Sequence, residues 1–123
     1  MQLSQETQTG GDHVRFVASD RILLASGERR GSFVIAAGVD TFDWPVRNAK
    51  AMAPGDCDAL LALQPAVVIV GTGATQVFPS REIMAVFLTR RVGVEFMDNA
   101  AAARSFNVLL GEGRKVAAAF ILP

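Results

Sequence analysis

The sequence has 123 residues, of which 50% are hydrophobic and 20% are charged, so it is predicted to fold around one core rather than to stay disordered. Its 12 basic and 12 acidic residues cancel. This balance argues against nucleic-acid binding, because neutralising phosphates requires clustered Lys and Arg. A net charge near zero is also compatible with self-association as a homodimer.

Cysteine and histidine are too scarce to build a metal site. Cys57 is the only cysteine and His13 the only histidine, whereas a zinc site needs several converging ligands. No metal or cofactor is therefore expected. A lone cysteine forms no intramolecular disulfide and suits a reducing compartment, so the cytoplasm is the predicted location. No stretch approaches the roughly 20 apolar residues that span a bilayer, and no membrane span is expected.

Residues 1–11 are polar and lack the basic start and apolar run of a secretory signal, so they are predicted to be a flexible tail. Residues 12–123 are predicted to form a single α/β domain. Short apolar patterns that predict strands open this region, at residues 14–18, 22–24 and 33–36. The first two are predicted to form a hairpin, and residues 27–31 a polar break. Because Pro45 cannot donate to a sheet ladder, residues 39–54 are predicted to be an edge strand or an ordered loop with Trp44 packed inward.

Helix and strand patterns alternate from Asp56 onward. Helices are expected to begin near Asp56, Pro79 and Asp98, and strands are expected at residues 67–70, 93–97 and 115–122. Alternation of this kind favours parallel strands joined by right-handed crossovers. The predicted fold class is α/β, a single three-layer domain with a mixed, largely parallel central sheet flanked by helices and an additional N-terminal β-hairpin layer.

A glycine turn follows the β-branched run of residues 67–70 and is a candidate binding site. Gly71, Thr72 and Gly73 would let the backbone approach a ligand, and the N-terminus of the next helix favours an anion. The third glycine of a dinucleotide-binding fingerprint is missing, because Gln76 stands in its place. A tight turn with a purely structural role and a pocket for another small or partner group both stay open.

Polar residues of the last helix could extend this site. Asp98 ends a strand and could face the same crevice as Thr72, although a helix N-cap is the favoured interpretation. Arg104 and Asn107 are three residues apart and therefore share one helix face. They could bind an anion or a partner backbone, and an ordinary solvated face is the alternative.

No set of catalytic residues is evident. Ser80 has no accompanying base and is interpreted as a helix cap. Cys57 lies between two aspartates, whose charges should raise its pKa, and is interpreted as inert. Trp44 and Phe78 are candidate anchors for a partner, because large aromatic residues are enriched at interfaces, with burial in the core as the alternative.

An ordered series of motifs runs through residues 31–123. It comprises Gly31-Ser32-Phe33, Trp44-Pro45-Val46, Pro65 with the run from Val67 to Gly73, Phe78-Pro79, Gly93 to Asp98, and Ala103 to Asn107. The series resembles the uncharacterised small-domain family that includes mitochondrial complex I assembly factor 3 and the adipogenesis-associated domain protein. The resemblance implies a three-layer α/β fold and, in at least one relative, a non-enzymatic role in assembling a respiratory complex.

No catalytic residue is established for that family, so none is carried over. The positions that match its recurring motif are Gly71, Thr72, Gly73, Phe78, Pro79, Asp98, Arg104 and Asn107. Ser105-Phe106 stands where the family often has Thr-Tyr, so a role for a tyrosine hydroxyl does not transfer. The leading hypothesis is a non-enzymatic, assembly-factor-like domain that binds an unidentified protein. The alternative is a small-molecule or anion-binding protein, or a cryptic enzyme, that uses the crevice after residues 67–70.

Overall fold

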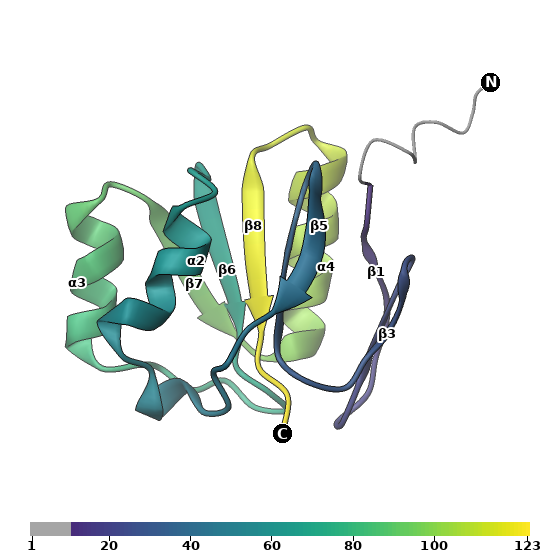
Figure 1. The fold of residues 1–123 in the computed structure, drawn as a ribbon, viewed down its shortest axis with the longest axis horizontal. Coiled ribbons are helices and arrows are strands. Elements are labelled where there is room, and N and C mark those ends of the chain that lie inside the picture. Colours follow the sequence, from purple (N-terminus) through teal and green to yellow (C-terminus); the bar gives the residue numbers. More distant parts are fainter. Residues whose placement is uncertain (1–10) are drawn as a thin grey trace.

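The structure, a computed structural model, describes residues 11–123, so nearly all of the predicted tail lies outside the described residues. The elements in chain order are β1 Val14–Val17, β2 Ile22–Leu24, β3 Gly27–Arg29, β4 Phe33–Ala36, β5 Val39–Asp43, the 3-10 turns η1 Ala49–Ala51 and η2 Pro54–Cys57, α2 Asp58–Leu61, β6 Val67–Gly71, α3 Arg81–Thr89, β7 Gly93–Met97, α4 Asn99–Gly111 and β8 Val116–Phe120. Figure 1 shows α2 and α3 on one side of a central sheet, and α4 with the small sheet containing β1 and β3 on the other.

The central sheet is mixed, as predicted. Its strand order is β5-β4-β8-β6-β7. β6 pairs in parallel with β7 and β8, whereas β4 is antiparallel to both β5 and β8. The β-branched run that predicted a doubly covered strand forms β6, and Val68, Ile69 and Val70 are all buried there.

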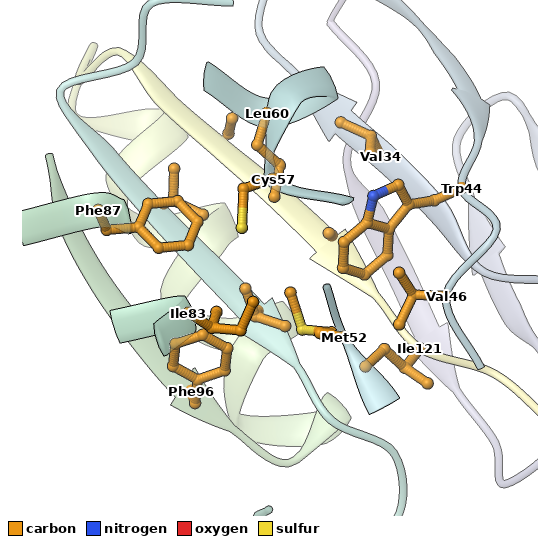
Figure 2. Close-up of a cluster of buried hydrophobic side chains, with 14 of the residues drawn as sticks. Val34, Trp44, Val46, Met52, Cys57, Leu60, Ile83, Phe87, Phe96 and Ile121 are labelled. Atoms are coloured by element: carbon orange, nitrogen blue, oxygen red, sulfur yellow. The ribbon is translucent and has the colours of Figure 1, made fainter. Parts of the chain in front are cut away.

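Alternating side chains of the central strands enter two separate cores. Val68 and Val70 belong to the core beneath α2 and α3, and Ile69 belongs to the core beneath α4. Figure 2 shows the first of these cores, where Cys57 lies among apolar side chains from several elements, with Phe87 and Leu60 near it. Every residue of β8 is buried, because this strand has a neighbour on each side and a core on each face.

The N-terminal layer differs from the predicted hairpin, because it has three strands. β2 pairs antiparallel with both β1 and β3, and β3 falls within the predicted polar break. Gly27 has φ of +137°, a backbone conformation that other residues rarely adopt, and this permits the tight turn between Leu24 and Gly27. The charged side chains of β3 suit an edge strand and pair with neighbours, as Arg29 does with Asp43 at 2.7 Å.

One helix start differs from the prediction, and a second is where it was predicted but lacks the expected side-chain cap. The helix expected from Asp56 begins at Asp58, because the Asp56 carboxylate accepts a hydrogen bond from the Ala53 N–H at 2.8 Å and so belongs to the preceding 3-10 turn. Ser80 is the N-cap residue of α3, but its side chain makes no capping hydrogen bond. The prediction for β7 coincides with the observed strand, residues 93–97.

Candidate functional site

The carboxyl ends of β6 and β8 meet the start of α4 at the buried side chain of Asn99. Its Oδ1 accepts from the Gly73 N–H at 3.1 Å, and its Nδ2 donates to the Ile121 carbonyl at 3.0 Å. Asn99 is only 4% exposed, and its one buried amide bonds backbone groups of two other segments. We call this arrangement the strand-end junction, made of Gly71, Thr72, Gly73, Asp98 and Asn99.

Thr72 shapes the loop that follows β6. Its buried hydroxyl donates to the Thr75 carbonyl at 2.7 Å and accepts from the Val77 N–H at 3.0 Å. Gly73 has φ of +110°, which favours glycine at this position. The glycine turn singled out in the sequence is therefore held by hydrogen bonds within the chain.

Asp98 caps α4. Its Oδ1 accepts from the Ala101 N–H at 2.8 Å, which satisfies one of the free donors at the helix N-terminus. The polar side chains of the strand-end junction are thus engaged with the chain's own backbone.

Arg104 and Asn107 face different parts of the molecule. Asn107 accepts from the Val14 N–H at 3.1 Å and donates to the Val14 carbonyl at 2.7 Å, so it fastens α4 to β1. Arg104 is exposed and lines a hollow on the opposite flank of α4. The hollows described below bring neither residue together with Thr72.

The two aromatic candidates also differ in exposure. Trp44 is 4% exposed, and its Nε1 donates to the Asp56 carbonyl at 3.0 Å. It packs in the core of Figure 2, as predicted for an inward-facing residue. Phe78 is 57% exposed, so of the two only Phe78 offers apolar surface to a partner.

A hollow of about 310 Å³ lies beside α4 and the face of β7 on the same side of the sheet. α4 packs mainly over β6 and β8, so it leaves this part of β7 open. We call the hollow the α4–β7 groove, and it is lined by Val67, Ile69, Glu95, Met97, Arg104, Ser105, Val108 and Leu109.

Most of these lining residues were not candidates in the sequence. Only Arg104 was singled out, whereas Glu95, Met97 and Val108 were missed. The available signal was the strand at residues 93–97, where charged Glu95 alternates with apolar neighbours and so indicates a half-exposed face. Val108 is 58% exposed, a large exposure for an apolar helix residue beside an apolar hollow.

A larger hollow, of about 860 Å³, lies between the β2–β3 turn and β5. At its wall Asp12 accepts hydrogen bonds from the Ser26 hydroxyl at 2.7 Å and the Thr41 hydroxyl at 2.8 Å. Burial alone raises the pKa of Asp12, but the hydrogen bonds outweigh it and hold the pKa below its ordinary value. Several polar groups that line this hollow thus already form hydrogen bonds with each other.

Cys57 is expected to resist thiol reagents in the folded protein near neutral pH. Its side chain is fully buried, and burial, aided by the charges of Asp56 and Asp58, raises its pKa to about 11. The thiolate is the reactive form, so both effects suppress attack. An aromatic disulfide reagent should detect no thiol until denaturant is added. Rapid labelling of the native protein would contradict this expectation.

In the part of the chain that the structure describes, His, Cys, Asp and Glu side chains nowhere gather in threes or more as a metal ion would require. Among the helices between residues 11 and 123, none combines the length and the apolar character needed to cross a bilayer.

A mixed sheet with helices on both faces and a three-stranded N-terminal sheet define an α/β protein with a Mth938-like fold. The structure is similar to that of a Bordetella pertussis protein described as a Mth938-like domain, with 25% identity, a TM-score of 0.80, and coverage of 98% of this chain and 92% of that one. The chain belongs to the family described as "Protein of unknown function (DUF498/DUF598)", whose model matches residues 14–121. This confirms the expectation of an uncharacterised family.

Two further relatives cover most of the chain. The structure of a Xanthomonas campestris protein is 40% identical with a TM-score of 0.85, and the match covers 99% of this chain and 92% of that one. A protein of Francisella tularensis subsp. holarctica named "13 kDa major membrane protein" is 26% identical over 102 residues, which are 82% of this chain and 83% of the relative. Both relatives are similar to the chain over most of their own length.

Proposed function

We propose that this protein is a non-enzymatic interaction domain that binds a protein partner through the α4–β7 groove. The observation that carries the proposal is the apolar floor that α4 leaves open beside β7, with Val108 exposed at its rim. Glu95 and Arg104 add charges of opposite sign to the same hollow. An apolar centre with a polar rim is the usual composition of a protein-binding surface.

An assembly-factor-like role is the finer form of this proposal. The motif series supports it, through the resemblance to the family that includes mitochondrial complex I assembly factor 3. The Francisella relative is named a membrane protein, which suits a partner that is itself associated with a membrane. We propose the cytoplasm as the compartment, because the free thiol of Cys57 suits reducing surroundings.

The alternative, a ligand site or cryptic enzyme in the crevice after β6, has less support. The Thr72 hydroxyl, the Asp98 carboxylate and the Asn99 amide all hydrogen-bond within the chain. A ligand that recruited them would have to break bonds whose loss is costly in a buried site. Binding of a partner in the α4–β7 groove would not require these hydrogen bonds to break.

Val108→Asp is expected to abolish capture of the partner, because the substitution places a charge beside the apolar floor of the groove. Leu88→Asp is the matched control, since Leu88 is another exposed apolar helix residue, 79% exposed, and lies outside the groove. Crosslinking of tagged full-length protein in its native cells, followed by mass spectrometry, measures the effect. A partner that Val108→Asp retains, or that both variants lose equally, would contradict the proposal.

A further inference from the structure

The outer edge of β7 carries backbone groups that no other described strand pairs, at the half-buried Val94 and at Phe96, which is only 4% exposed. The Thr72 N–H donates to the Met97 carbonyl at 2.8 Å, so Met97 turns its backbone groups toward β6. Backbone groups alternate between the two sides of a strand, and those of Val94 and Phe96 therefore point away from β6. Within residues 11–123, β7 has no strand on that side.

The Gln76 side chain hydrogen-bonds to one of these outward backbone groups. Its Nε2 donates to the Phe96 carbonyl at 2.9 Å and so caps one end of the edge. The N–H and carbonyl of Val94 and the N–H of Phe96 have no backbone partner among the described residues. An unpaired edge of this kind is a template on which another strand can form.

Two charges beside this edge also lack partners. Glu95 and Arg104 both line the α4–β7 groove, and neither forms an ion pair with another residue of the described chain. Arg21, Arg29 and Arg30, in or beside the N-terminal sheet, pair by contrast with nearby carboxylates. The groove thus offers an apolar floor with one unpaired charge of each sign.

We propose that β7 accepts an extended segment of a partner protein as an added strand. The segment places a Lys or Arg opposite Glu95, an apolar side chain over the groove, and an Asp or Glu within reach of Arg104. Main-chain hydrogen bonds to Val94 and Phe96 supply affinity, and the alternating side chains supply specificity. This inference rests on the proposed function, because it specifies how the partner binds.

A second copy of the chain fits the edge less well than such a partner. In the antiparallel register that pairs Val94 with Phe96 of the other copy, the two Glu95 residues lie directly opposite, with Cα atoms about 4.5 Å apart. Like charges in that arrangement destabilise strand pairing. Glu95 therefore disfavours self-pairing in this register and favours a basic residue on a different protein.

Selection of displayed random peptides on the full chain tests the inference. Enriched peptides are expected to alternate apolar and polar residues, with Lys or Arg at one fixed position. Val94→Pro removes an outward N–H and is expected to weaken their binding about tenfold. Glu95→Arg is expected to change the preference at the fixed position to Asp or Glu. Glu112→Arg is the matched control, because Glu112 is exposed at the end of α4 and outside the groove.

Hydrogen exchange of the full chain with an enriched peptide supplies a second readout that needs no variant. Slower exchange of the Val94 and Phe96 amides is expected. The inference is overturned if no peptide is enriched, if Glu95→Arg keeps the original charge preference, or if those amides gain no protection. A native partner lost with Val108→Asp in the absence of enriched peptides would reject strand addition while leaving the interaction function in place.

Discussion

Gly71→Ala is expected to lower the free energy of unfolding by about 3 kcal/mol, because the junction has no room for a side chain. An added Cβ would collide with Asn99 Oδ1, and it would lie 2.9 Å from Phe120 Cδ1 and 3.2 Å from Ala102 Cβ. Asn99 would have to move and give up its buried hydrogen bonds. The cost of overpacking is thus added to the cost of unsatisfied backbone groups.

Urea unfolding followed by circular dichroism measures this loss. Gly111→Ala is the matched control, because a Cβ there meets nothing within 4 Å and Gly111 is the last residue of α4. It is expected to change stability by less than about 1 kcal/mol, since alanine has the higher helix propensity. Similar losses in the two variants would show that close packing at Gly71 is not the cause.

Asn99→Ala is also expected to cost about 3 kcal/mol, because it leaves one buried and one partly buried backbone group without partners. These groups are the Gly73 N–H and the Ile121 carbonyl. The same substitution should speed hydrogen exchange of the Gly73 amide, which identifies the junction as the place where stability is lost.

Asn107→Ala provides the comparison for Asn99. Asn107 also bonds one N–H and one carbonyl of the backbone, both of Val14, but its side chain is only partly buried. The Asn107 side chain is more exposed than that of Asn99, so water can enter the space that it leaves, and its loss is expected to be smaller than that of Asn99. A larger loss for Asn107→Ala would contradict the role assigned to the junction.

The strongly patterned parts of the fold were predictable from the sequence. The run at residues 67–70 specified a strand covered on both faces, and β6 forms there. The extra strand β3 was missed because its three residues, Gly27 to Arg29, have no apolar alternation and owe their pairing to the preceding turn. Short polar edge strands depend on a neighbouring strand for their hydrogen bonds. The local sequence pattern does not indicate which strand that neighbour is.

The candidate site was less predictable, because it depends on how α4 sits on the sheet. The spacing of Arg104 and Asn107 places both on one helix face, but β1 lies on one flank of that face and the open groove on the other. The burial of Asn99 arises in the same way, from segments distant in sequence. Helix periodicity specifies which residues point toward a sheet, but it does not specify which strands they cover.

The position of β8 has a consequence for synthesis of the chain. β8 lies between β4 and β6 at the centre of the sheet, although all the other described elements precede it in sequence. Until residues 116–120 leave the ribosome, the β4–β5 hairpin and the β6–β7 pair have no strand to join them. Until β8 is synthesised, the nascent chain therefore exposes two unpaired strand edges, which favour aggregation. If translation stalls before Val116, the two halves of the sheet should remain unpaired and become substrates for chaperones or proteases.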